Sequence, residues 1–73
     1  MEKGQVIELE NSQKYAIADN INLDNKNYIY LVNLDNNSDI CFAEYNSEKI
    51  IFVNDDNLYG RLIVEVYKNQ KNN

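Results

Sequence analysis

Histidine, proline and tryptophan are absent from this sequence of 73 residues, cysteine occurs once and glycine twice. The lack of histidine excludes the commonest general base, the usual catalytic zinc ligand and every histidine-activated nucleophile. A lone cysteine, Cys41, excludes an internal disulfide and any zinc or iron–sulfur site built from several thiolates. We therefore predict that the protein is not an enzyme, has no catalytic or metal-binding residues and needs no cofactor.

Positive charge is also scarce, because seven Lys and Arg residues stand against twelve Asp and Glu residues, which gives a net charge of −5. A domain that binds nucleic acid gathers its basic residues on one face, whereas here they are dispersed along the chain. We expect no direct contact with nucleic acid. An acidic chain suits a basic protein partner instead, including a protein that itself binds nucleic acid.

Long apolar runs are missing, and none approaches the roughly 18 residues that a membrane-spanning helix needs. The polar start of the chain does not resemble a signal peptide. These features, together with the single cysteine, predict a cytoplasmic protein that does not enter a membrane. The length allows one small domain. We expect this domain to span residues 1–68 and to be followed by a disordered polar tail at residues 69–73.

Asparagine is abundant, with 14 residues, and it marks most of the expected turns in a chain without proline. Between these turns lie five segments with alternating, β-branched or aromatic residues that predict strands. The segments are residues 5–9, 14–23, 28–34, 39–45 and 49–53. Their short connections favour an antiparallel meander. Strict alternation in the second segment places Tyr15, Ile17, Ile21 and Leu23 on one face of the sheet.

The last part of the chain changes to helical spacing. Its apolar stripe consists of Leu58, Tyr59, Leu62, Ile63, Val66 and Tyr67. Asn54 is the expected N-cap, and Asp55 and Asp56 suit the first turn. Gly60 and the β-prone residues 62–66 leave an edge strand as the alternative. We predict an α+β fold, with a four- to five-stranded antiparallel meander sheet and one C-terminal helix packed on one face.

One helix of this length covers only one face of such a sheet, so the other face is left for a partner or for a second copy in a homodimer. If the helix packs on the side of Ile29 and Leu31, the side chains of Tyr28 and Tyr30 lie on the open face. Tyrosine is enriched at protein interfaces, although these tyrosines also suit a core. The predicted partner-binding residues are Tyr28, Tyr30, Tyr45, Asp35, Asp39 and Glu44.

Four segments, residues 14–17, 27–33, 39–42 and 55–67, resemble the short acidic YrzB-like proteins of unknown function from low-GC bacteria and their mobile elements. The motifs concerned are the Lys-Tyr-Ala-Ile strand, the Asn-Tyr-Ile-Tyr-Leu-Val-Asn strand, the Asp-Ile-Cys-Phe strand and the terminal acidic helix. The resemblance implies a small α+β fold and carries no catalytic residue.

These observations together predict a small non-enzymatic protein-binding module. The frequent Asn, Ile, Lys and Tyr residues are typical of AT-rich coding in a bacterium or its phage. In that setting, we expect an inhibitor of a host nucleic-acid-handling or defence protein, similar to an anti-CRISPR protein. The alternative is a housekeeping regulator or ligand-binding protein, although the chain has no Gly-rich phosphate loop.

Overall fold

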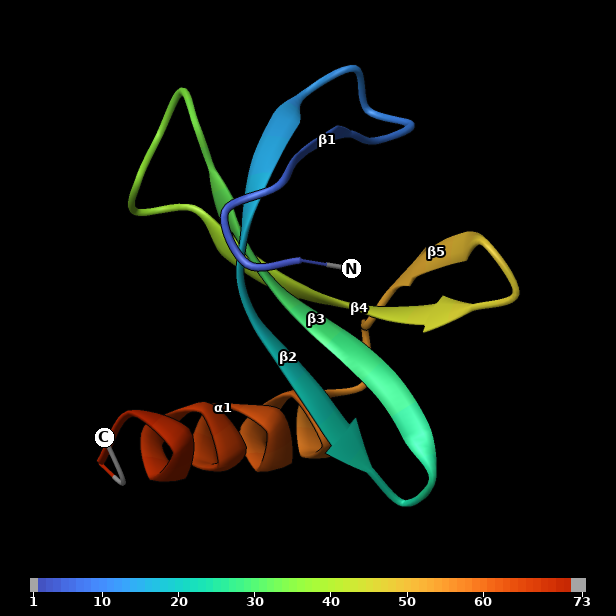
Figure 1. The fold of residues 1–73 in the computed structure, drawn as a ribbon, viewed down its shortest axis with the longest axis vertical. Coiled ribbons are helices and arrows are strands. Elements are labelled where there is room, and N and C mark those ends of the chain that lie inside the picture. The colour runs from blue at the N-terminus through green and yellow to red at the C-terminus, as the bar shows by residue number, and fades with distance from the viewer. Residues whose placement is uncertain (1, 72–73) are drawn as a thin grey trace.

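The computed structural model describes residues 2–71, which form a five-stranded sheet followed by one helix (Figure 1). The elements are β1 (Val6–Glu8), β2 (Lys14–Leu23), β3 (Lys26–Asn33), β4 (Ile40–Asn46), β5 (Lys49–Phe52) and α1 (Asp56–Lys71). The strands pair in sequence order, and every pair is antiparallel. The predicted α+β fold, with an antiparallel meander and one C-terminal helix, is confirmed. No helix within residues 2–71 has the length and apolar character to cross a membrane.

Two of the hairpins have two-residue turns that contain no glycine. Asp24 and Asn25 connect β2 to β3 with φ angles of 54° and 64°. Ser47 and Glu48 connect β4 to β5 with φ angles of 49° and 70°. Positive φ at both central residues is the geometry that matches the twist of a tight hairpin, and asparagine and aspartate tolerate it best after glycine. The polar turn residues therefore set the order of the meander.

Strand β2 changes face halfway along its length. Its register with β3 shifts by one residue between Ile17 and Asp19, so that Ile17 pairs with Leu31 while Ile21 pairs with Tyr28. An extra residue in one strand exchanges the two faces for everything beyond it. The prediction that the apolar residues of this strand share one face is therefore wrong, because alternation in sequence does not reveal a bulge.

The cluster between sheet and helix contains the residues of β2 beyond the bulge and the even-numbered aromatic residues of β3 and β4. Its buried members are Ile21, Tyr28, Phe42, Leu62 and Val66. The Phe42 ring stacks on Tyr30 with centroids 5.1 Å apart and meets Tyr59 edge-on at 5.0 Å. We call this the helix cluster. The helix does not pack on the side of Ile29 and Leu31, which was the condition for exposed Tyr28 and Tyr30, because the aromatic rings lie on the side that the helix covers.

A second cluster occupies the opposite face, where no helix of residues 2–71 packs. Its buried members are Tyr15, Ile17, Ile29, Leu31 and Ala43, and the partly buried apolar residues packed against it are Ile7, Leu9, Cys41 and Ile50. Among the partly buried residues, Ile7 belongs to β1 and Ile50 belongs to β5, which are the two edge strands of the sheet. Both edge strands must therefore curl over the same face. We call this the curled-sheet cluster. The expected open face is therefore closed by the sheet itself.

Helix α1 begins one residue later than predicted and continues further. The Asp55 side chain is the cap, since its Oδ1 accepts hydrogen bonds from the backbone N–H groups of Asn57 (2.9 Å) and Leu58 (3.3 Å). Asn54 does not have this role. The helix includes residues 69–71, which we predicted to be part of a disordered tail, and residues 72–73 lie outside the described residues.

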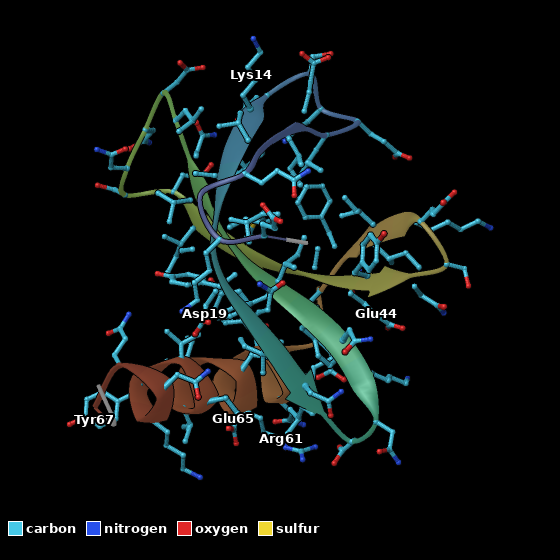
Figure 2. All side chains as sticks on the ribbon, in the orientation of Figure 1. Lys14, Asp19, Glu44, Arg61, Glu65 and Tyr67 are labelled. Carbon is cyan, nitrogen blue, oxygen red and sulfur yellow. The ribbon has the colours of Figure 1, made fainter. Side chains whose placement is uncertain are left out.

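The end of the helix is tied to the bulge of β2 through Asp19, which is 7% exposed (Figure 2). One carboxylate oxygen accepts the backbone N–H of Asn20 at 2.9 Å and lies 3.4 Å from the Lys3 ammonium. The other oxygen accepts the side-chain amide of Asn69 at 3.1 Å. This last bond gives residue 69 an ordered role and explains why the helix does not end at residue 68. A buried carboxylate with partners on both oxygens avoids the cost of an unpaired charge.

Only two of the six residues in the predicted apolar stripe of the helix are buried, and two more, Leu58 and Tyr59, are partly buried. Leu62 and Val66 face the sheet, whereas Ile63 is 46% and Tyr67 is 64% exposed. Tyr67 lies at the far end of α1 (Figure 2). The stripe is wider than the surface that the helix cluster offers, because the twisted sheet meets the helix along a narrow line.

Candidate functional site

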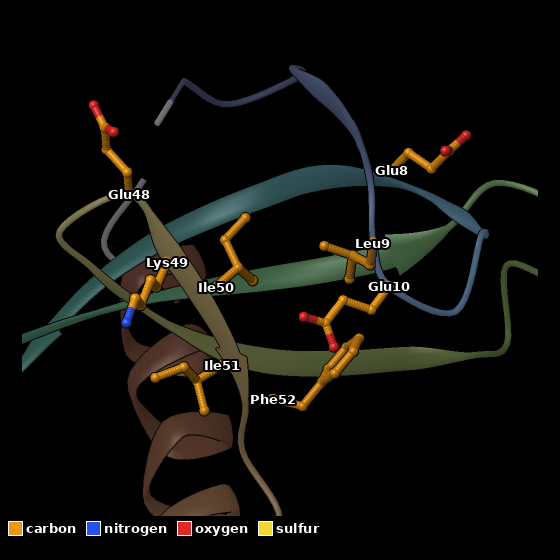
Figure 3. A pocket seen from close by; sticks show the side chains of 8 residues that line it. All are labelled: Glu8, Leu9, Glu10, Glu48, Lys49, Ile50, Ile51 and Phe52. Carbon is orange, nitrogen blue, oxygen red and sulfur yellow. The ribbon is translucent and has the colours of Figure 1, made fainter.

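The two edge strands of the sheet border a cleft of about 700 Å³ (Figure 3). It is lined by Glu8, Leu9, Glu10, Glu48, Lys49, Ile50, Ile51 and Phe52. These residues come from β1 and the turn that follows it, and from the second turn residue and strand of the β4–β5 hairpin. We call this hollow the edge cleft. Its volume lies within the range of about 300–1,000 Å³ that is typical of ligand-binding sites.

The floor of the edge cleft is apolar. Leu9 and Ile50 are partly buried and pack against the curled-sheet cluster from opposite sides (Figure 3). The Phe52 ring is 39% exposed and meets the Tyr15 ring edge-on, with centroids 6.4 Å apart. The floor therefore continues the core of the domain out to solvent, and an apolar group placed in the cleft would extend that core.

The rim of the edge cleft is acidic. Three carboxylates, those of Glu8, Glu10 and Glu48, stand against the single ammonium group of Lys49. The ion pairs found among residues 2–71 use other side chains, so these four groups are not neutralised within the described part of the chain. A cleft with charges of one sign in excess attracts ligands of the opposite charge.

The backbone of both edge strands has unpaired hydrogen-bonding groups towards the cleft. The N–H of Val53 donates to the carbonyl of Phe42 at 2.9 Å, which fixes the side of the chain that faces β4. Because these groups alternate along a strand, those of Ile50 and Phe52 are directed to the opposite side. On the other edge, the N–H of Leu9 faces β2, because it donates to the carbonyl of Gln13 at 3.0 Å. The backbone groups of the preceding residue, Glu8, are therefore directed away from β2. Unpaired strand edges are templates for pairing with another chain.

The predicted partner-binding tyrosines are not gathered on one surface. Tyr28 is 4% exposed within the helix cluster, and Tyr30 is partly buried against Phe42 in the same cluster. Tyr45 is partly buried near the C-terminal end of β4 and, together with the edge of Tyr28, lines a second hollow of about 320 Å³. The prediction that Tyr28 and Tyr30 form an exposed contact face is wrong, because the helix covers both residues.

The predicted acidic residues are also dispersed. Glu44 lies near the end of β4 (Figure 2), while Asp35 and Asp39 belong to the loop between β3 and β4. Asp39 has a structural role there, since its carboxylate and its carbonyl both accept hydrogen bonds from the buried Asn33, at 3.2 and 3.0 Å. The Asn33 side-chain oxygen in turn accepts the N–H of Asp35 at 2.8 Å. These hydrogen bonds account for the conformation of the β3–β4 loop without a contribution from a partner.

Sequence reasoning did not identify the edge cleft. One signal was present, because Ile50, Ile51 and Phe52 are apolar at consecutive positions of a terminal strand that should alternate. The other signal was the five predicted strand segments, because the first and last strands of a five-stranded antiparallel meander have the same direction and cannot pair with each other in the antiparallel pattern. Neither signal locates a cleft without knowledge of how strongly the sheet curls.

Cys41 lies on β4 and packs against the curled-sheet cluster. Burial, with a smaller contribution from the nearby carboxylate of Asp39, raises the pKa of its thiol to about 11. At pH 8, about one thiol in a thousand is then ionised. Only the thiolate reacts with alkylating agents, so we expect iodoacetamide to modify the native protein about a hundredfold more slowly than the unfolded chain. Mass spectrometry at pH 8, with and without guanidinium chloride, measures both rates.

The native rate should rise about tenfold for each pH unit between 8 and 10, because the thiolate fraction rises in that proportion below the pKa. Equal rates in the native and unfolded protein at pH 8 would contradict the expected protection of Cys41.

No group of three or more Asp, Glu and Cys side chains within residues 2–71 is arranged to hold a metal ion.

The chain matches no protein-family model, and no curated protein or solved structure is found to be similar to it. The resemblance to the YrzB-like proteins therefore stays a prediction.

Proposed function

We propose that the protein is a small non-enzymatic protein-binding module and that its partner binds in the edge cleft. The observation that carries this proposal is that two unpaired strand edges border one cleft with an apolar floor. Backbone pairing supplies affinity in such sites, and pockets for alternate side chains supply specificity. The cleft residues provide both, because Leu9, Ile50 and Phe52 form the floor beside the free edges.

The charge of the protein supports a basic partner. The net charge is −5, and three carboxylates rim the cleft. Complementary charge raises the rate of association and selects against acidic competitors. A host protein that handles nucleic acid, or takes part in defence, has basic surfaces of this kind, and its inhibition by this module is the biological role we propose.

A photo-crosslinking experiment tests where the partner binds. A photoreactive amino acid replaces Ile51 in one protein and Val64 in the other, and both are expressed in cells of the source organism. The two residues are similarly exposed, at 52% and 50%, but Ile51 lines the cleft and Val64 lies on the helix. We expect a defined partner to be crosslinked from position 51 and not from position 64.

Binding of the identified partner is then measured for Phe52→Lys, with Val64→Lys as the matched control. A charge on the apolar floor is expected to weaken binding by about tenfold or more, while the control binds normally. Circular dichroism verifies that both variants are folded. Crosslinking from position 64 alone, or equal affinity of both variants, would overturn the assignment of the cleft.

The alternative is a ligand-binding regulator, which the cleft volume also suits. A thermal-shift screen with nucleotides and metal ions separates the two functions, because a bound ligand raises the midpoint of unfolding, and the rise grows with the logarithm of the ligand concentration above Kd. A shift that Phe52→Lys abolishes would favour the ligand-binding function.

A further inference from the structure

The directions of the strands restrict what can fill the edge cleft. In the antiparallel meander, β1, β3 and β5 run in one direction, and β2 and β4 run in the other. The two edge strands therefore have the same direction in the order of the sheet. They cannot close the sheet by pairing with each other in the antiparallel pattern of the other strands. One further strand, antiparallel to both, would make every neighbouring pair antiparallel.

We infer that the occupant is a single extended segment of a basic partner, which closes the curled sheet as a sixth strand and runs antiparallel to β1 and β5. This inference rests on the function proposed above and specifies the partner. Closure removes both unpaired edges of the sheet at once, as it does in barrels. The backbone groups available for pairing are those of Ile50 and Phe52 on one side and of Glu8 on the other.

The size of the cleft fits one strand. A strand advances about 3.4 Å per residue, lies about 4.8 Å from each neighbour and occupies a layer about 10 Å deep, so four residues fill about 650 Å³. The cleft holds about 700 Å³. The bordering strands have three and four residues, so they match a segment of this length.

The side chains of the segment must alternate in character. Those directed to the floor meet Leu9, Ile50 and Phe52 and are apolar. The intervening side chains point away from the floor. These side chains, and those of the chain on either side of the inserted residues, are Lys or Arg that pair with the carboxylates of Glu8, Glu10 and Glu48 on the rim. Lys49 is the one basic group on the rim. A second copy of this chain is a poor occupant, because it would bring its own Glu8, Glu10 and Glu48, which lie on or beside its edge strands, against the same carboxylates.

Synthetic peptides of about six residues test the inference. In the first peptide, valine alternates with lysine; in the second, the same residues are rearranged to remove the alternation; in the third, glutamate replaces lysine. Affinity is measured by titration followed with NMR, and amide hydrogen exchange is measured on the complex. We expect the first peptide to bind about tenfold or more tightly than either of the others.

The first peptide should also slow exchange of the N–H groups of Ile50 and Phe52 by about tenfold or more, because these donors become paired. Nuclear Overhauser contacts between peptide and protein Hα atoms should report antiparallel pairing with both edges. A variant with Glu8→Lys, Glu10→Lys and Glu48→Lys is expected to prefer the glutamate peptide, while retaining the fold by circular dichroism.

Each contrary result has a defined meaning. Equal binding of the lysine and glutamate peptides, parallel pairing, or no slowing of exchange at Ile50 and Phe52 at the solubility limit overturns the sixth strand. If the partner still crosslinks from position 51, the proposed protein-binding function stands and only its strand-insertion form fails. Protection that grows with protein concentration in the absence of peptide identifies a second copy as the occupant and also overturns the inference.

Discussion

Substitution of Leu62 by alanine is expected to lower the free energy of unfolding by about 3 kcal/mol. Leu62 is fully buried in the helix cluster and is the side chain through which the middle of α1 contacts the sheet. Its loss removes apolar contacts with β2 and β4 and leaves a cavity that the surrounding rings cannot fill completely. A domain of this length has a total stability of about 4–11 kcal/mol, so the loss is a large fraction of it. Urea denaturation followed by circular dichroism measures the change.

The matched control is Ile63→Ala, on the same turn of the helix. Ile63 is 46% exposed, and alanine is a better helix former than isoleucine, so this change should cost less than about 1 kcal/mol. A loss below about 1 kcal/mol for Leu62→Ala would contradict the helix packing described above. The edge cleft lies on the other side of the sheet, so a folded Leu62→Ala protein should bind the alternating peptide with unchanged affinity.

The order of the strands could be predicted from the sequence because the turns are encoded locally. The pairs Asp24–Asn25 and Ser47–Glu48 are polar, stand between apolar segments and adopt positive φ angles. Polar residues that tolerate positive φ favour a tight hairpin through the local geometry of the backbone. The helix also has local signals, namely its apolar spacing and an acidic cap, although the cap was assigned to Asn54 rather than to Asp55.

The faces of the sheet could not be predicted in the same way. A bulge between Ile17 and Asp19 depends on the register with β3, which no pattern in β2 reports. Without it, Tyr15 and Ile21 are assigned to the same face. The side on which the helix packs was also a choice between two apolar faces, and the large rings of Tyr30 and Phe42 determined it.

The edge cleft could not be predicted from the sequence, for a different reason. It exists because the sheet curls until Leu9 and Ile50 pack against one cluster, and curvature is a property of all five strands together. The acidic rim follows from this curvature, since Glu10 and Glu48 are separated by about half of the chain. Composition alone therefore indicates the sign of charge that we propose for the partner, but not the surface at which we propose that it binds.

Substitution of Leu31 by alanine is expected to cost about 3 kcal/mol of unfolding free energy, as much as the loss of Leu62. Leu31 is fully buried in the curled-sheet cluster, opposite Ile17 of β2 and Cys41 of β4. No helix packs on this face, and the cavity would be surrounded by strands from both ends of the sheet. The result distinguishes a face that is core in the isolated chain from one that is completed by a partner.

The control for this change is Leu34→Ala, three residues along the chain, where the side chain is 47% exposed and the cost should be below about 1 kcal/mol. Urea denaturation is carried out at two protein concentrations. If the cluster is completed within one chain, the free energy lost through Leu31→Ala is the same at both concentrations. A small loss, or stability that rises with concentration, would show that a second chain covers this face. The first outcome leaves the edge cleft, and not the face beneath it, as the surface available to a partner.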